Sequence, residues 1–431
     1  MPPAKPPKVV TATVPLLTRA HCEKILAKAC GTESNLQLKE FTLKPAIYTS
    51  GFLGEYYHLL VCFSAAAAAG AAGAANENEN LANRRDLQEL RAFVKRVPQA
   101  SVEPEKEAIF RKEAALYGTL LERLRNYSTV AWSPHCFYTR DDIIVLEQLD
   151  ERNYALCSET VDVLSEHYMR SVLRGLAAQH ASCFTLETKE GICIGDAYPQ
   201  LQEEITVSAQ VPWYTTGLRA ILAVAKSQLV SQSSGVRAEI ESRLASAAES
   251  VYEMTNRSSK YRNVLCHRDI WRGNIFYSSV ATSSDTNANE RSVIFVDYQT
   301  ARYCPPAIDV IFALFMNLDK STRKSKEGEY LLHYYDCLER DLSSKGLVAA
   351  DHLTYSELLA SYEELQLFGL FYRAIATTIV KVPRQYVTND YVHVERTEAV
   401  FKLMESQPQF REYLEECIQE ILEFLIAQNA K

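Results

Sequence analysis

The feature that most constrains this chain is a pair of short stretches in its second half. The first, His267–Asn274, has the form H-x-D-x-x-x-x-N and follows an apolar run, Val264–Cys266, that predicts a short buried strand. The second, Val293–Gln299, is an apolar run that leads into the carboxylate of Asp297. Ile275–Tyr277 and the start of the second stretch predict a hairpin. A strand, a loop, a hairpin and a carboxylate in this order are hard to obtain by chance.

Four polar side chains of these stretches suit phosphoryl transfer from ATP. That reaction asks a protein mainly for positioning and for neutralisation of charge. Asp269 is the candidate for the catalytic carboxylate that meets the acceptor hydroxyl. Asn274 and Asp297 are candidate ligands of Mg²⁺, which prefers oxygen donors. His267 would be a strut that hydrogen-bonds to the backbone and holds the loop in shape.

The first half of the chain offers a lysine and an acid for the phosphate side. Lys95 lies in a strand-like run and is the candidate for the residue that contacts the phosphates. A helix is predicted over 105–124, and Glu113 within it is the candidate partner of Lys95. Glu107 and Glu122 compete for that role, and both members of the pair could equally be ordinary exposed charges.

A second predicted hairpin would lead into the segment that binds the adenine base of ATP. Cys136–Tyr138 and Ile143–Glu147 have the pattern of two strands joined by an acidic turn. The residues from Glu147 to Leu149 would then form a hinge whose backbone meets the base.

Glycines near the start of the chain suggest a weak phosphate cradle. Gly51 and Gly54 lie between the apolar runs Phe41–Tyr48 and Tyr56–Phe63, where glycine would let backbone N–H groups approach a phosphate. Any hairpin turn can carry the same two glycines, so both interpretations stay open.

Five motifs taken together resemble the ecdysteroid kinase-like, or CHK kinase-like, family, which is related to choline kinases and aminoglycoside phosphotransferases. The resemblance extends from about residue 15 to 425. The motifs are Phe-Val-Lys-x-x-Pro (93–98), Phe-x-x-Glu-x-x-x-Tyr (110–117), Leu-Ala-Ala-Gln-His-Ala-x-Cys (176–183), His-x-Asp-x-Trp-x-x-Asn (267–274) and Asp-Tyr-Gln-x-x-Arg-Tyr-x-x-Pro-Ala-x-Asp (297–309).

The resemblance implies an α+β fold of the two-lobed protein-kinase type and phosphorylation of a small-molecule hydroxyl, with ecdysteroids the best-known substrate class. It implies the site roles given above, and it makes Asp309 a buried acid that braces the catalytic loop. The expected parts are a tail at 1–14, a nucleotide-binding lobe at 15–149 with a mostly antiparallel sheet and a low-complexity insertion at 64–86, and a mainly helical lobe at 150–431 with the catalytic loop and the acceptor site.

Two positions depart from the family pattern. Arg268 stands where glycine is more usual, and Gly273 stands where asparagine is frequent. Arg268 creates the H-R-D triplet of protein kinases. However, Asp309 follows Asp297 too soon to leave room for an activation loop, which favours a small acceptor.

Two other functions remain open at this point. One is a pseudokinase that binds or sequesters a small apolar ligand, suggested by the poor glycine loop and Arg268. The other is phosphorylation of choline or an aminoglycoside-type amine, which would need an acidic or aromatic pocket. The aromatic candidates for an acceptor pocket are Trp213, Tyr214, Trp271, Phe368 and Tyr372, although core packing explains the last two and the 213–214 pair equally well.

Composition excludes several classes of partner. The net charge of −8 over 431 residues argues against a nucleic acid. The 11 cysteines are scattered without metal-ligand spacing, as expected of a reducing compartment. No signal peptide or membrane span is predicted, so we expect a cytoplasmic protein that needs Mg²⁺, ATP and a small-molecule acceptor, without an obligate protein partner.

Overall fold

The computed structural model describes residues 16–31, 36–46, 54–65, 87–98, 104–157, 163–279 and 291–427. The chain divides into two compact units. One consists of Met1–Ser101 with His135–Gln148, and the other of Val102–Pro134 with Leu149–Lys431. The tail at 1–14, Gly51 and most of the insertion at 64–86 lie outside the described residues.

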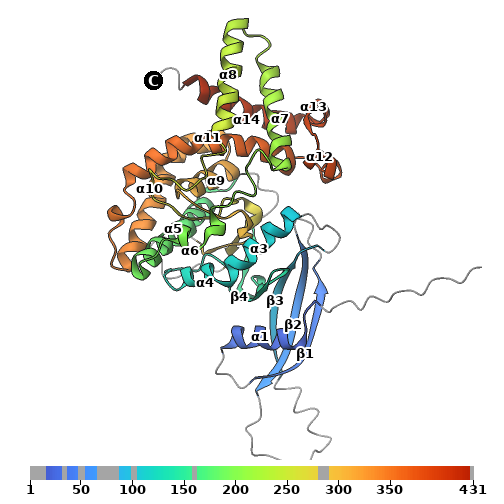
Figure 1. Cartoon of the computed structure of the whole chain (residues 1–431), viewed down its shortest axis with the longest axis vertical. Coiled ribbons are helices and arrows are strands. Elements are labelled where there is room, and N and C mark those ends of the chain that lie inside the picture. Colours follow the sequence, from blue (N-terminus) through green and yellow to red (C-terminus); the bar gives the residue numbers. More distant parts are fainter. Residues whose placement is uncertain are drawn as a thin grey trace, which may run out of the picture. The chain divides into compact units, whose positions relative to one another are not determined.

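Within its described residues, the first unit contains a five-stranded antiparallel sheet and the helix α1 (Figure 1). The strand order is β1-β2-β3-β5-β4, and α1 contacts β1 and β4. All five residues of β5 are buried, as its interior place in the sheet requires. The elements are α1 (Arg19–Cys30), β1 (Leu36–Pro45), β2 (Glu55–Ala65), β3 (Gln88–Arg96), β4 (Cys136–Arg140) and β5 (Ile143–Glu147).

The second unit is mainly helical and carries two small antiparallel sheets, β10-β7 and β6-β8-β9. Its strands are β6 (Tyr154–Leu156), β7 (Val264–Cys266), β8 (Ile275–Ser278), β9 (Val293–Phe295) and β10 (Arg302–Cys304). Its α-helices are α3 (Pro104–Gly118), α4 (Leu120–Arg125), α5 (Glu166–Glu190), α6 (Ile194–Ala197), α7 (Pro212–Gln228), α8 (Ser234–Ser250), α9 (Ala307–Asn317), α10 (Lys320–Ser344), α11 (Tyr355–Val380), α12 (Asn389–His393), α13 (Thr397–Ser406) and α14 (Pro408–Ala427). Short 3-10 helices are η1 (Asp150–Arg152), η2 (Pro199–Leu201), η3 (Arg272–Asn274), η4 (Tyr298–Thr300), η5 (Ala349–Asp351) and η6 (Arg384–Tyr386).

Helix α5 lies at the centre of the second unit and packs on α9, α10, β7 and β9. Gly175 permits the contact with β9, because a Cβ at that position would stand 2.4 Å from Val293. Helix α11 packs on α9 and α14, and Figure 1 shows α7 and α8 side by side next to α14. The packing of α5 on β7 and β9 positions the small sheets that carry the polar motifs.

The predicted α+β fold class is confirmed: an antiparallel sheet forms the first unit and helices form most of the second. The two predicted hairpins are present as β4–β5 and β8–β9. The single helix expected over 105–124 is instead two helices, since Thr119 leaves the helical region at φ −136°. Residues 102–134, which the sequence analysis placed in the nucleotide-binding lobe, group with the second unit, because α4 packs on α5 and α3 packs on η4.

Among the described helices, none combines the length and the apolar character needed to cross a lipid bilayer.

Candidate active site

The H-x-D-x-x-x-x-N stretch is a loop between β7 and β8, and a buried carboxylate holds its start. Oδ2 of Asp309 accepts the backbone N–H of His267 at 2.7 Å, and Oδ1 accepts that of Arg268 at 2.8 Å. Asp309 lies on α9 and is fully buried. These are charge-assisted bonds in a dry environment, so they fix the loop firmly. The bracing contact that the resemblance implied is therefore present.

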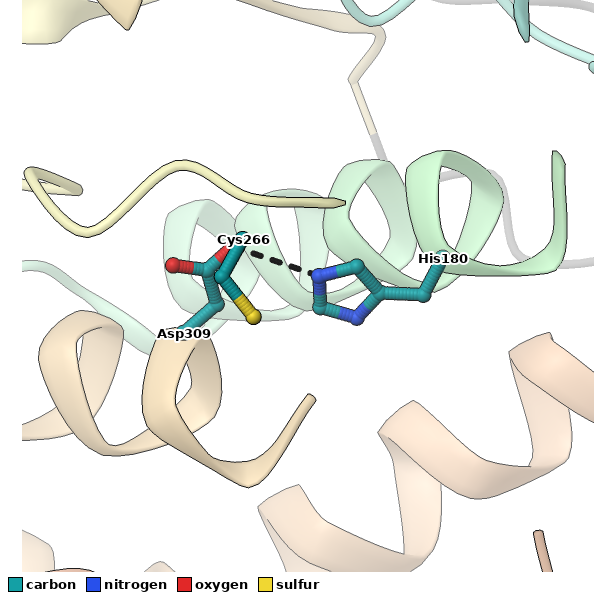
Figure 2. Close-up of side chains that lie close together, drawn as sticks. All are labelled: His180, Cys266 and Asp309. Atoms are coloured by element: carbon teal, nitrogen blue, oxygen red, sulfur yellow. Dashed lines mark hydrogen bonds and ion pairs between the residues drawn. The ribbon is translucent and has the colours of Figure 1, made fainter. Parts of the chain in front are cut away.

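His180 and Cys266 approach the same carboxylate, as Figure 2 shows. The ligand atoms of the three residues lie within 4.8 Å of one another, which is close enough for a metal ion. Each is already hydrogen-bonded. His180 lies 3.2 Å from Asp309 through Nε2 and 2.7 Å from the Tyr334 hydroxyl through Nδ1, and the Cys266 thiol faces the carbonyl of Pro305. We therefore interpret this cluster as a hydrogen-bonded brace of the loop.

His267 has the role of a strut that the sequence predicted. Its Nε2 faces the Val296 carbonyl at 2.9 Å, and its Nδ1 receives the backbone N–H of Asp269 at 3.2 Å. Only the neutral ring with the proton on Nε2 satisfies both contacts. Burial lowers the pKa of His267, which favours this neutral form. The strut thus connects the catalytic loop to the residue before Asp297.

Asn274 and Asp269 meet across the loop. The Asn274 side-chain amide donates to Oδ2 of Asp269 at 2.8 Å and to the Asp269 carbonyl at 3.0 Å. Both partners are acceptors, so the NH₂ group must face them and Oδ1 must point the other way. The five-residue step predicted from the sequence therefore brings these two side chains together.

Asp297 has a left-handed backbone with φ 71° and ψ 60°. It directly follows Val296, whose N–H donates to the Asn274 carbonyl at 3.0 Å and whose carbonyl faces His267. The next residue, Tyr298, is fully buried and donates to Gln179 at 2.9 Å. These neighbours hold Asp297 in a conformation that costs about 1–2 kcal/mol for a residue other than glycine.

The chemistry of the donor set fits Mg²⁺. The Asn274 amide presents its oxygen away from Asp269, and Asp297 contributes a carboxylate, so both donors are the hard oxygens that this ion prefers.

The residues predicted for the nucleotide side fall on different parts of the structure. Lys95 lies on β3 in the first unit and Glu113 on α3 in the second, so their pairing stays a prediction. The Glu147 N–H donates to His135 at 2.9 Å, and the Leu149 carbonyl accepts from Arg152 and Tyr154. A base would therefore have to use other backbone groups of 147–149. Gly51 lies outside the described residues.

Sequence reasoning missed two polar side chains that complete the loop. The Thr300 hydroxyl donates to the His267 carbonyl at 2.7 Å, and the Asn317 amide donates to the Ile270 carbonyl at 2.7 Å. Both satisfy buried carbonyls that the irregular loop cannot pair internally. The only sequence signals for these residues are their positions: Thr300 follows Asp297 closely, and Asn317 ends α9.

The aromatic candidates lie beside the loop. The Tyr372 ring contacts those of Trp213 and Phe368 at 5.9 and 5.7 Å between centroids. Burial and the neighbouring charge of Asp269 raise the pKa of the Tyr372 hydroxyl. Tyr214 packs edge-on against Trp213. Four of the five predicted aromatic residues thus form one cluster, which reaches the surroundings of Asp269.

The departure at Gly273 has a local explanation. A Cβ at residue 273 would stand 2.4 Å from the ring of Trp271, the fifth aromatic candidate. The ring therefore packs directly over the glycine backbone, where no larger residue fits.

Residues 78–346, more than half of the chain, match the ecdysteroid kinase-like family. The chain belongs to that family. A search of curated proteins found no match.

Several solved structures resemble the chain at low identity. An ethanolamine kinase of Plasmodium vivax is 12% identical, with 87% of this chain and 83% of that chain covered and a TM-score of 0.40. A gentamicin complex of APH(2″)-IIa is 12% identical, with 95% and 99% covered and a TM-score of 0.40. A microcompartment-associated aminopropanol kinase is 13% identical, with 93% and 97% covered and a TM-score of 0.37. At these TM-scores the likeness carries no argument about activity.

The role of Asp309 in holding the start of the loop can be tested directly. Asp309→Asn leaves one acceptor oxygen for two backbone N–H groups, so one buried donor loses its partner. We expect the free energy of unfolding to fall by about 1–3 kcal/mol. Urea denaturation measures this loss, and Asp351→Asn, which changes an exposed aspartate, is the control. Equal stability of the two variants would contradict the bracing role.

A buried lysine near the loop makes stability depend on pH. Burial, together with the adjacent Arg268 guanidinium, lowers the pKa of Lys112 to about 7. The unfolded chain binds this proton up to the ordinary lysine pKa, whereas the folded chain releases it above pH 7. Stability from this group therefore rises with pH between about 7 and 10.5.

Lys112→Met removes that dependence. We expect the variant to exceed the unmutated protein in unfolding free energy by roughly 3–5 kcal/mol at pH 6, with the difference vanishing towards pH 10. Chemical denaturation across this pH range measures it. The exposed Lys189→Met is the matched control, and a gain that does not change with pH would contradict the argument.

Proposed function

We propose that this chain transfers the γ-phosphoryl group of Mg²⁺–ATP to a hydroxyl group of a small molecule. The observation that carries the proposal is the contact between Asn274 and Asp269. It orients the Asp269 carboxylate and turns the amide oxygen of Asn274 outward from the same loop. A positioned carboxylate beside hard oxygen donors is the arrangement that phosphoryl transfer requires.

Each residue has a role in this proposal. Asp269 accepts a hydrogen bond from the acceptor hydroxyl and takes its proton as the new O–P bond forms, while the bond from the γ-phosphorus to the β–γ bridging oxygen breaks and ADP leaves. Asn274 and Asp297 would hold Mg²⁺, which when bound neutralises charge on the phosphates. The phosphate side would be contacted by Lys95, supported by Glu113, and by the backbone at Gly51. The segment from Glu147 to Leu149 would meet the base.

We further propose that the acceptor is an apolar alcohol such as an ecdysteroid. The cluster of Trp213, Phe368 and Tyr372 beside Asp269 suits a large apolar body. Arg268 and Arg302 are buried nearby with one carboxylate, Glu204, between them. Choline or an aminoglycoside-type amine is the alternative acceptor, because the Asp269 carboxylate near Tyr372 would attract a cation.

The catalytic carboxylate can be tested by Asp269→Asn. The amide cannot take a proton, so we expect the turnover number to fall by roughly 10²–10⁴-fold. ATP affinity should stay within about threefold, since Asp269 is placed on the acceptor and not on the nucleotide. Phosphate transfer and nucleotide titration measure the two quantities. Normal turnover by this variant would refute the mechanism, and the exposed Asp336→Asn serves as the control.

The proposed metal ligand can be tested by Asp297→Asn. Asparagine tolerates the left-handed backbone at φ 71°, so the substitution removes charge with little strain. We expect Mg²⁺-dependent ATP binding to weaken by about 10–100-fold, with metal-free ATP binding unchanged. Calorimetric titration with and without Mg²⁺ measures the two ATP affinities separately. An unchanged effect of Mg²⁺ would exclude Asp297 as a ligand.

The acceptor itself can be sought with a metabolite extract that contains ecdysteroids. Purified protein is incubated with Mg²⁺–ATP and the extract, beside Asp269→Asn, and mass spectrometry detects ions that gain one phosphate. A gain seen only with the unmutated protein supports the kinase and identifies its acceptor. No gain together with no ATP binding would favour a pseudokinase that holds a small apolar ligand.

A further inference from the structure

A buried ionic cluster behind the catalytic loop has no role in the mechanism above. Its centre is Glu204, which lies in the segment between η2 and α7. The Arg268 and Arg302 guanidinium groups each donate through Nη1 to Oε2 of Glu204 at 2.8 Å. Both arginines are at most 3% exposed. One carboxylate therefore serves as the common ionic partner of two arginines that are removed from water.

Both oxygens of the Glu204 carboxylate accept several hydrogen bonds. Oε1 accepts the Thr206 N–H, the Thr206 hydroxyl and the Val207 N–H, each at 2.8 Å. Oε2 also accepts the Thr255 hydroxyl at 3.3 Å. Burial alone would raise the pKa of Glu204, but the two guanidinium groups hold it well below its usual range. Glu204 is thus a permanently ionised anchor.

The two arginines differ in how much they depend on this anchor. Arg302 also donates to the Gln202 carbonyl at 2.7 Å and to Asn256 at 3.0 Å. Among the described residues, Arg268 hydrogen-bonds its guanidinium only to Glu204, and its Nε has no partner. The Arg268 guanidinium also lies over the ring of Phe368, 5.9 Å from its centroid. Loss of Glu204 would therefore leave Arg268 as an uncompensated buried charge.

Arg268 directly precedes Asp269 and has a left-handed backbone with φ 63°. Arg268 and Asp269 share a peptide bond, so a backbone rotation that carried the Arg268 side chain towards water would also shift the Asp269 carboxylate. The brace at Asp309 holds the Arg268 N–H, but it does not hold the guanidinium.

We propose that Glu204 is a positioning residue for phosphoryl transfer: it holds the Arg268 guanidinium as a clamp and thereby helps to fix the neighbouring Asp269. This inference rests on the proposed function in so far as Asp269 is the catalytic carboxylate. It assigns Glu204 no contact with substrate. The clamp is needed because this chain carries arginine, and not glycine, at position 268.

The test is a cycle of Glu204→Gln and Arg268→Gly. Glu204→Gln keeps the shape of the side chain but removes its charge, so we expect the turnover number to fall by about 10–100-fold with KM for ATP unchanged. In the Arg268→Gly background the same substitution should change turnover by less than about twofold, because the buried charge next to Asp269 is then absent and Arg302 keeps its bonds to Gln202 and Asn256. Glu203→Gln, an exposed neighbour, is the charge-matched control.

A second readout does not depend on activity. Hydrogen exchange of the peptide spanning 267–274 should be about tenfold faster in Glu204→Gln and return towards normal in the double variant. If Glu204→Gln does not fold, Glu204→Asp keeps the charge but shortens the side chain, and it should show the same pattern more weakly.

The outcomes separate the two ideas. Turnover and loop exchange that are unchanged in Glu204→Gln would overturn the clamp and leave the kinase standing. An equal loss in both backgrounds would also overturn it, because Glu204 would then act only on its own segment. If the unmutated protein transfers no phosphate while the exchange pattern holds, the proposed function fails and the clamp on the loop is retained.

Discussion

The arrangement of the candidate active site depends on one carboxylate, that of Asp309. Two consecutive backbone N–H groups at the start of the loop converge on its two oxygens. Because the carboxylate is fully buried, water cannot replace either bond. His180 supplies a further contact from α5, and Tyr334 supports His180 from α10. Three helices therefore fix the position from which the catalytic loop begins.

This anchoring makes two strained residues possible. Arg268 and Asp297 both have positive φ, a conformation that residues other than glycine rarely adopt. Each lies next to a residue held by buried hydrogen bonds: His267 before the first, Val296 before the second. The His267 ring joins the two positions, since it contacts the Val296 carbonyl and the Asp269 N–H. The strain at Arg268 and Asp297 is thus supported by one shared hydrogen-bond network.

The sequence predicted the parts of the site that depend on local spacing. The contact of Asp269 with Asn274 follows from five residues in one loop, and the β8–β9 hairpin follows from alternation. Glu204 could not be predicted, because it lies 64 residues before Arg268 in a segment without periodicity. The break at Thr119 was also missed, since the apolar stripe continues across it. Long-range ionic partners leave no periodic signal.

Each of the two residues that depart from the family pattern, Arg268 and Gly273, has a specific contact in the structure. At residue 268 the left-handed backbone would suit glycine, and the arginine found there is compensated by Glu204. At residue 273 the glycine provides the space that the Trp271 ring occupies. Contacts within the chain therefore accommodate both unusual residues, since the Arg268 guanidinium has an ionic partner and the Trp271 ring packs on the Gly273 backbone.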